Sequence, residues 1–343
     1  MTIYSNKGDV VMQRSYFAGA NTVNGFVSYY GQIFGEIERT YIIKGGSGTG
    51  KSRLMKEIAD AAESKGREVE YFYCSFDPSS VDGIIVDGSL AVIDGTAPHV
   101  YEPSLPGVRE NLIDLGAFWD EKILACRGDE IRTLLRRKKK CFDMAYSYLL
   151  AVKGLDRAKE NIVGKYIKRD KISVAAANIL SKSKPVKSGK DCVRLVSALG
   201  KNGRTKFDTF ENIASEKVNI CDTVGAGYVF LEEIRNESRR RGIPVAVSYD
   251  PLFEGRIDAL LLGGSVAVSL SPNGETFIEE EILENEREEL RSLDGHISLF
   301  ESKAEDYLKK AAEIHFNIES IYVSAMDFER KEKFTKKFIE THI

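Results

Sequence analysis

Gly45-Gly46-Ser47-Gly48-Thr49-Gly50-Lys51-Ser52 is the most informative segment of this 343-residue chain. Its glycines allow successive backbone N–H groups to turn inward around anionic oxygens. A lysine and a hydroxyl residue follow the last glycine, which is the order of a phosphate-binding P-loop, or Walker A motif. In such a loop Lys51 contacts the β- and γ-phosphates of a nucleotide, and the Ser52 hydroxyl ligates Mg²⁺.

The segments on either side of this loop have the pattern that a P-loop requires. Residues 40–44 are typical of a short buried strand, and residues 53–65 have the apolar spacing of an amphipathic helix that ends at Gly66. The N-terminus of such a helix attracts anions. We therefore expect Gly45–Ser52 to bind the phosphates of ATP. The alternative is a glycine turn without a ligand.

Length and composition predict a soluble protein of two domains. The hydrophobic content of 43% and the charged content of 29% are those of a globular protein. Residues 1–14 lack an apolar signal core, and no apolar run approaches about eighteen residues, so we expect no secretion signal, no membrane span and a cytoplasmic location. The five cysteines form no Cys-x-x-Cys pair, which favours reduced thiols over a structural zinc site.

Charge is distributed unevenly along the chain. Residues 132–206 contain 21 Lys and Arg but 5 Asp and Glu, whereas residues 275–305 contain 11 acidic and 3 basic residues. We predict that a basic helical arm (132–171) packs beside an acidic arm (275–305) of the same molecule, mainly through apolar seams. The run Arg136–Lys140 is then a solvated or internally paired helix face. Nucleic-acid binding is the less favoured alternative, because no aromatic-interleaved motif accompanies the run.

A shift of 176 residues aligns the two halves of the chain. Gly66 falls on Gly242, and Gly88–Val92 falls on Gly264–Val268. Each half has the order strand, loop, helix, strand, Asp-Pro turn and strand, which favours parallel α/β sheets. The expected strands are residues 40–44, 68–75 and 90–94, and then 217–221, 244–248 and 265–270.

Further segments complete each half. Strand-like residues 16–20 and 193–198 precede the two units, and helical stretches, residues 107–182 and 277–335, follow them. We therefore predict an α/β fold of two tandem P-loop NTPase-like parallel-sheet units, each followed by a long helical segment. The predicted domains are residues 1–185, with the intact loop and the basic arm, and residues 186–343, with the acidic arm. Residues 182–190 are the expected linker.

The second loop, Asp222–Tyr228, lacks the chemical groups of the first. Gly227 stands at the position of Lys51, Tyr228 stands at the position of Ser52, and Asp222 would repel phosphate. We expect this half not to bind a triphosphate in the usual way, because the lost contacts are charge-assisted ones. One nucleotide should then bind per chain. The alternative is that the alignment misleads and that this half is a separate kind of domain.

A carboxylate at the end of a neighbouring strand completes the magnesium site of P-loop enzymes. Asp94 follows the apolar residues 90–93, and its counterpart in the second half is Leu270. The lysine, the hydroxyl and this carboxylate are thus present together in one half and absent together in the other. This coincidence predicts that Asp94 is the Walker B residue, although an Asp-Gly turn before Gly95 is the alternative.

Other polar residues near these strands have less certain roles. Asp77 follows the second strand, where it could contact magnesium through water or act as a base. The match of Asp77 to Asp250 in the second half favours a structural Asx turn instead, and Asp82 is interpreted in the same way. His99 could sense the γ-phosphate, and Arg204 is the candidate arginine finger from the second half.

The chain resembles a family of tandem P-loop ATP-binding proteins found mainly in Firmicute bacteria. Three segments support this resemblance: Phe17–Ala20, the P-loop and Asp94–His99. It covers nearly the whole chain and implies the P-loop NTPase fold and ATP binding at Gly45–Ser52. In that family the second loop can also look like a working P-loop, from which this chain departs.

We expect slow, Mg²⁺-dependent ATP hydrolysis coupled to a conformational change. Gly95 stands where many fast ATPases place a catalytic Glu, which argues for a slow rate. Phosphoryl transfer to a small molecule, with Asp77 as base, is one alternative. A non-catalytic ATP-sensing module that presents its helical arms to a partner is the other.

Overall fold

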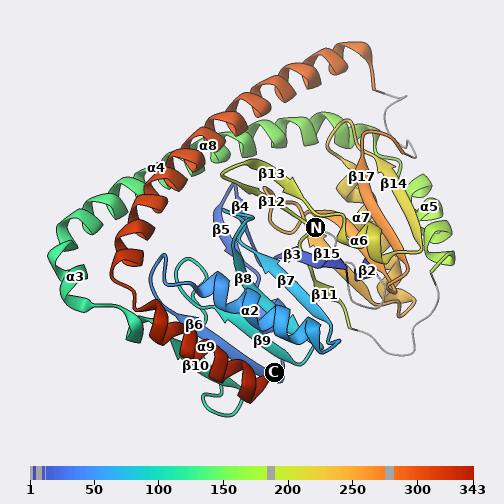
Figure 1. Cartoon of the computed structure of the whole chain (residues 1–343). Coiled ribbons are helices and arrows are strands. Elements are labelled where there is room, and N and C mark those ends of the chain that lie inside the picture. Colours follow the sequence, from blue (N-terminus) through green and yellow to red (C-terminus); the bar gives the residue numbers. More distant parts are fainter. Residues whose placement is uncertain (1–2, 5–9, 12, 184–189, 275–281) are drawn as a thin grey trace.

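The computed structural model describes residues 3–4, 10–11, 13–183, 190–274 and 282–343. Two β-sheets lie next to each other, and two long helices run along both of them (Figure 1). Most of the expected linker and the first residues of the acidic arm lie outside the described residues. Within the described part of the chain, none of the helices combines the length and the apolar run that a bilayer crossing needs.

The first sheet contains the strand that precedes the P-loop. Its order is β10 (Glu110–Asp114), β6 (Arg39–Lys44), β9 (Leu90–Asp94), β8 (Val81–Val86), β7 (Val69–Tyr73) and β3 (Arg14–Phe17). β10, β6 and β9 are parallel, β8 is antiparallel to both neighbours, and β7 and β3 are parallel. Alternate side chains pack on α2 (Lys51–Ser64) and on α1 (Tyr30–Phe34), so both faces of the sheet are covered.

The second sheet repeats this order over five strands. They are β14 (Glu216–Cys221), β17 (Val266–Ser271), β16 (Ile257–Leu262), β15 (Val245–Tyr249) and β11 (Cys192–Val193). Their relative directions match those of β6, β9, β8, β7 and β3. Helix α7 (Gly227–Arg240) begins and ends 176 residues after α2. The sequence repeat is therefore also a repeat of strand order and direction.

Both sheets are mixed, whereas the sequence predicted parallel sheets. The difference arises from β8 and β16, which the sequence pattern did not identify as strands. Residues 74–80 connect β7 to β8, and residues 250–256 connect β15 to β16. Connections this short join antiparallel neighbours, because a parallel pair needs a crossover of a dozen or more residues.

The strand pairing corrects one correspondence between the halves. The Cys74 N–H donates to the Ser80 carbonyl at 3.0 Å, and the Asp250 N–H donates to the Arg256 carbonyl at 2.7 Å. Each of these hydrogen bonds closes the connection that follows β7 or β15, and the residues of the second bond lie 176 positions after those of the first. Asp250 therefore corresponds to Cys74, and the expected match of Asp250 to Asp77 is wrong. The role of Asp77 must be judged from its own contacts.

Several shorter elements lie outside the two main sheets. They are the pairs β1 (Ile3–Tyr4) and β2 (Val10–Val11), β4 (Gly19–Thr22) and β5 (Gly25–Ser28), and β12 (Ser197–Gly200) and β13 (Gly203–Lys206), together with α6 (Thr209–Ile213). The expected strands at residues 16–20 and 193–198 are each divided in two, since the chain leaves the sheet and enters a hairpin. The first hairpin, β4–β5, contacts the second, β12–β13, so the halves meet there.

The helical stretches contain five helices among the described residues: α3 (Glu121–Cys126), α4 (Gly128–Val163), α5 (Arg169–Ser181), α8 (Glu284–Ser324) and α9 (Phe328–His342). The predicted helical stretch 107–182 is wrong at its start. There the chain forms β10, which pairs with the open edge of β6, and a short 3₁₀ turn at Leu115–Phe118. Tertiary pairing thus overrides the local pattern.

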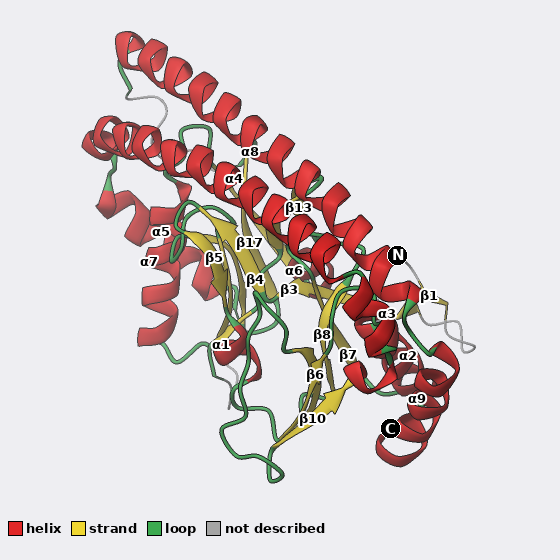
Figure 2. Cartoon of the chain, turned by 90° about the vertical axis from the view of Figure 1, so that its left-hand side faces the viewer, coloured by secondary structure: helices red, strands yellow, loops and turns green. Residues whose placement is uncertain are grey.

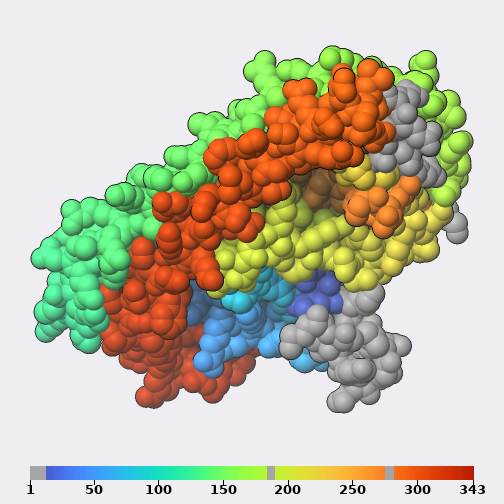
Figure 3. All heavy atoms as spheres, turned by 90° about the horizontal axis from the view of Figure 1, so that it is seen from above, coloured from blue at the N-terminus to red at the C-terminus, as the bar shows by residue number. Residues whose placement is uncertain are grey.

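Helices α4 and α8 lie side by side and antiparallel across the upper face of the molecule (Figures 2 and 3). Ala145 and Leu149 of α4 are fully buried together with Ala304 and Leu308 of α8. The rings of Tyr148 and Tyr307 stack with centroids 5.9 Å apart. An apolar seam therefore holds the arms together, and surface ion pairs add little to it.

The last helix of each stretch packs on the sheet of the other half. Phe338 of α9 belongs to the same buried cluster as Ile58 of α2. Ile172 of α5 belongs to the cluster around Ile234 of α7. The C-terminal helix thus closes the core beneath the P-loop helix, and the two halves share their cores.

Candidate functional site

The segment 45–52 connects the end of β6 to the start of α2, as the sequence predicted. Thr49 Oγ1 donates to the Gly46 carbonyl at 2.9 Å, which fixes the curve of the loop. Gly50 adopts a left-handed conformation with φ of 82° immediately before the helix. The first turn of α2 therefore begins at Lys51, so its backbone N–H groups and its positive helix end are directed toward the loop.

Lys51 and Asp94 face each other across this loop. Lys51 Nζ donates to the carbonyls of Gly46 at 2.8 Å and Gly45 at 3.3 Å, and it lies 3.6 Å from Asp94 Oδ2. Both side chains are nearly buried. Burial raises the pKa of Asp94, while the charge of Lys51 acts in the opposite direction. The amine is thus held by neutral carbonyls and a nearby carboxylate, partners that a phosphate could replace.

Asp94 and Ser52 place oxygen atoms that could ligate a metal ion at the loop. Thr96 donates to Asp94 Oδ1 from its backbone N–H at 2.8 Å and from its hydroxyl at 2.6 Å, which leaves Oδ2 on the side of Lys51. Ser52 Oγ accepts one hydrogen bond, from the Val81 N–H at 2.9 Å. A hydroxyl with a lone pair to spare and a carboxylate oxygen are ligands suited to Mg²⁺.

Asp77 is fully engaged by its neighbours. Its Oδ1 accepts from the Ser79 N–H at 3.1 Å and from the Ser79 hydroxyl at 2.7 Å, and its Oδ2 accepts from Lys201 Nζ at 2.6 Å. Burial opposes ionisation, but these hydrogen bonds outweigh it and lower the pKa of Asp77. This arrangement fits the Asx-turn alternative better than the role of a base, because a low pKa makes a weak proton acceptor.

Arg204 lies away from the P-loop. Its Nη2 bonds Glu301 Oε1 at 2.8 Å, and its side chain lines a pocket beside the second loop. Arg204 belongs to β13, whereas Lys201, in the turn between β12 and β13, reaches the first half and pairs with Asp77. The prediction that Arg204 is an arginine finger is therefore wrong. The turn between β12 and β13 nevertheless extends toward the half that contains the P-loop.

His99 is buried rather than open to a phosphate. Its Nε2 lies 3.0 Å from Asp82 Oδ2, and each side chain is about 8% exposed. The ring stacks on Tyr30 at a centroid distance of 5.3 Å. Burial would lower the pKa of His99, but the charge and hydrogen bond of Asp82 outweigh it and raise it.

Three residues from the long helices approach the P-loop, and sequence reasoning missed them. Lys138 Nζ of α4 lies 2.8 Å from His315 Nδ1 of α8, and Glu319 lies one turn further along α8. Burial and the charges of Lys138 and Lys51 lower the pKa of His315 to about 4. The neutral ring therefore accepts a hydrogen bond from the lysine. None of the described carboxylates lies within ion-pair distance of Lys138.

The spacing of the apolar residues in α4 indicates that Lys138 lies on the buried face of this helix. It stands four residues after the buried Leu134 and seven before the buried Ala145, which are steps of one face of a helix. Within the run Arg136–Lys140 it is the one residue that is not exposed. The other four lie on the solvated face that the sequence predicted for the run.

The C-terminal part of α8 covers the P-loop. A Cβ at Gly46 would lie 2.8 Å from Tyr322 Cε1, and a Cβ at Gly48 would lie 2.8 Å from the Glu319 carbonyl oxygen. Both distances are shorter than real contacts, so only glycine allows the helix to approach this closely. The loop backbone and α8 are therefore in direct contact.

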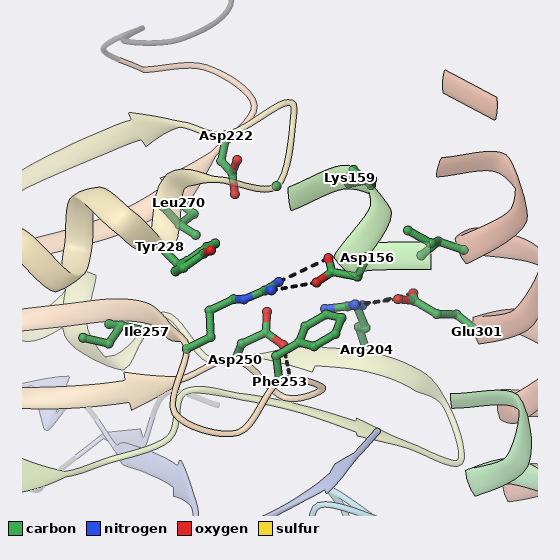
Figure 4. A pocket seen from close by; sticks show the side chains of 13 residues that line it. Asp156, Lys159, Arg204, Asp222, Tyr228, Asp250, Phe253, Ile257, Leu270 and Glu301 are labelled. Carbon is green, nitrogen blue, oxygen red and sulfur yellow. Dashed lines mark hydrogen bonds and ion pairs between the residues drawn. The ribbon is translucent and has the colours of Figure 1, made fainter. Parts of the chain in front are cut away.

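The second loop borders a pocket of about 170 Å³ (Figure 4). The Arg256 guanidinium lies between the rings of Tyr228 and Phe253, 4.4 Å and 4.1 Å from their centroids. It donates to Asp156 Oδ2 at 2.6 Å and to Glu160 Oε1 at 2.8 Å. Arg256, paired with two carboxylates of the chain, thus lies next to the second loop, which lacks the lysine.

Comparisons of this chain with protein-family models, with curated proteins and with solved structures gave no match. A function must therefore be inferred from the geometry of the site.

Proposed function

We propose that the chain binds Mg-ATP at Gly45–Ser52 and hydrolyses it slowly, with one site per chain. The main support is the placement of Lys51 Nζ within 3.6 Å of Asp94 Oδ2 at the start of α2, beside the Ser52 hydroxyl. A phosphate-binding loop, a lysine and two oxygen ligands are the parts that this chemistry needs. The family resemblance points to the same site.

Each residue has a role that follows from its present contacts. Lys51 would exchange the Gly46 carbonyl for the β- and γ-phosphate oxygens, and the loop N–H groups would surround the same phosphates. Ser52 and Asp94 would hold Mg²⁺, which neutralises charge on those phosphates when it is bound. The raised pKa of Asp94 reflects a buried carboxylate that a cation would stabilise.

Lys138 and Lys201 would supply further positive charge from outside the P-loop unit. The two lysines and Lys51 all influence the pKa of His315, so these four groups lie close together. Lys201 is paired with Asp77, whereas Lys138 is bonded to a neutral histidine. A partly buried lysine that lacks a carboxylate favours an anionic ligand.

Two observations support slow turnover coupled to movement. Gly95 follows Asp94, and both oxygens of Asp77 are occupied, so neither position provides a free base for water. The contacts of α8 with Gly46 and Gly48 would have to loosen before a nucleotide could enter. Nucleotide binding would thus be linked to the position of α8. Because α8 covers the loop in this way, an ATP-sensing module is the second candidate function.

Among the described residues, none of the five cysteines forms a disulfide bond. We propose a cytoplasmic location, since thiols persist in reducing compartments.

With Mg-ATP and no other acceptor, the protein should release inorganic phosphate slowly, and it should release none without Mg²⁺. Lys138→Met should lower this rate about tenfold, because it removes a charged contact worth about 1.5 kcal/mol while it keeps the apolar stem in the seam. A coupled phosphate-release assay measures both rates.

Lys139→Met is the matched control, because Lys139 is exposed and pairs with Asp143 on the outer face of α4. Equal rates for the two variants would remove Lys138 from the site. Tight binding of ATP without any phosphate release would favour the sensing module over hydrolysis.

A further inference from the structure

Cys74, Asp82 and His99 form a cluster that the proposed nucleotide chemistry does not use, in which Asp82 and His99 are buried and Cys74 is half-buried. Cys74 directly follows β7, Asp82 belongs to β8, and His99 lies in the loop after β9, so three adjacent strands bring them together (Figure 1). One ligand atom from each residue lies within 4.8 Å of the other two. The three residues are 8 and 17 positions apart in the chain, so no sequence spacing pointed to them.

The Asp82 carboxylate is the centre of this cluster. It accepts a hydrogen bond from His99 Nε2 at 3.0 Å, and Asp82 and His99 are each 6% exposed. Burial and the charge of Asp82 raise the pKa of the Cys74 thiol. An imidazole thus directs a proton at this buried carboxylate, and a thiol lies within 4.8 Å of both.

The surroundings hold the imidazole in place. Tyr30 stacks on the His99 ring with an interplanar angle of 14°, and Phe26 meets it edge-on at 4.9 Å. The Tyr30 hydroxyl donates to the Asp82 carbonyl at 3.1 Å. Within the described part of the chain, the buried His99 Nδ1 has no hydrogen-bond partner. The ring is therefore oriented by packing and by the bond of Nε2 to Asp82.

We propose that Cys74, Asp82 and His99 bind one divalent transition-metal ion of the zinc class. A thiolate and an imidazole favour such ions, whereas Mg²⁺ prefers oxygen ligands alone. The metal would take the place of the thiol proton of Cys74 and of the Nε2 proton that now joins His99 to Asp82. Binding would release the thiol proton to solvent, and the Nε2 proton would be released where His99 is charged or move to Nδ1 where His99 is neutral. The cysteine pattern predicted no structural zinc site, because no Cys-x-x-Cys pair is present, and the site proposed here uses a single cysteine.

The second half does not repeat this ligand set. Its counterpart of Cys74 is Asp250, which accepts hydrogen bonds from the backbone N–H groups of Leu252 and Phe253. Its counterpart of Asp82 is Asp258, which is bonded to Ser197. The thiol is thus specific to the half that contains the intact P-loop. The proposal requires no nucleotide, so it stands or falls independently of the proposed function.

Cobalt(II) serves as a spectroscopic probe for this site. Chelator-treated full-length protein should bind one equivalent of Co²⁺, with visible ligand-field bands and a near-ultraviolet sulfur-to-cobalt charge-transfer band. Zn²⁺ should displace the cobalt and abolish both bands. Cys74→Ser should remove the charge-transfer band, and His99→Asn should weaken Co²⁺ binding at least tenfold, since loss of a ligand has at least the effect of loss of an outer partner. Cys126→Ser, at an exposed cysteine on α3, is the matched control and should bind as the wild type does.

The wild-type titration does not depend on whether the variants fold. No cobalt bands in the wild-type protein would overturn the proposal, as would an unchanged charge-transfer band in Cys74→Ser. Thermal unfolding gives a second measurement, because a metal that binds only the folded chain must raise the unfolding temperature. Zn²⁺ should therefore raise it in the wild type and in Cys126→Ser, and an equal rise in Cys74→Ser would contradict the assignment.

Discussion

Lys51→Ala should abolish Mg-ATP binding and turnover, with a loss of at least a hundredfold in affinity. The substitution removes the amine at the head of α2 and leaves Asp94 Oδ2 without the cation that now lies 3.6 Å away. Charge-assisted hydrogen bonds to phosphate are worth about 1.5–3 kcal/mol each, and this lysine would contact two phosphates. Titration with a fluorescent ATP analogue measures the affinity.

Lys65→Ala, at the other end of α2, is the control for a general loss of charge, because Lys65 follows the last turn of the helix. Circular dichroism should show that both variants remain folded. Unchanged affinity and turnover in Lys51→Ala would exclude the P-loop as the nucleotide site.

Asp258→Asn should stabilise the protein at pH 8 by up to about 3 kcal/mol and at pH 4 by no more than about 0.5 kcal/mol. Burial raises the pKa of Asp258 to about 6 from its ordinary 3.8, and the charge of Asp250 adds to this effect. One carboxylate oxygen is buried without a hydrogen-bond partner among the described residues. The other accepts from Ser197, and an asparagine carbonyl can keep that bond.

The direction of the pH dependence follows from the raised pKa. Below pH 3.8 the carboxyl is protonated in both the folded and the unfolded chain, and its contribution to stability is fully present. As the pH rises through 6, the folded chain must ionise a buried group and this contribution is lost. Urea denaturation at pH 4 and pH 8 measures the difference, with the exposed Asp306→Asn as control. A gain of equal size at both pH values would show that ionisation is not the cause.

The sequence predicted the elements whose pattern is local. β6, β9, β14, β17 and α2 lie within a residue or two of their predicted positions, because alternation, helical spacing and stop glycines define them. β8 and β16 were missed, since Asp82 and Asp258 interrupt their apolar runs while pairing with neighbours on both sides stabilises the strands. β10 was predicted as helix because an edge strand with an exposed Leu112 has little alternation.

The sequence predicted only the part of the candidate site that comes from the contiguous motif Gly45–Ser52 and from the end of β9. Lys51, Ser52 and Asp94 lie within 44 positions of one another and come together in the structure. Lys138, Glu319 and Lys201 reach the same place from the helical arms and from the second half. Their approach depends on the antiparallel packing of α4 and α8. The sequence showed an apolar face on each helical stretch, but not which residues of one helix lie opposite which residues of the other.

A calorimetric titration of the 343-residue chain with Mg-ATP counts its nucleotide sites. We expect the intact P-loop to bind one nucleotide, whereas the second loop has Gly227 in place of the lysine and Arg256 already seated between Tyr228 and Phe253. We predict one site per chain for the wild type and none for Lys51→Ala. No binding by the wild type would exclude the P-loop as an ATP site, and two equivalent sites would show that the second half also binds a nucleotide.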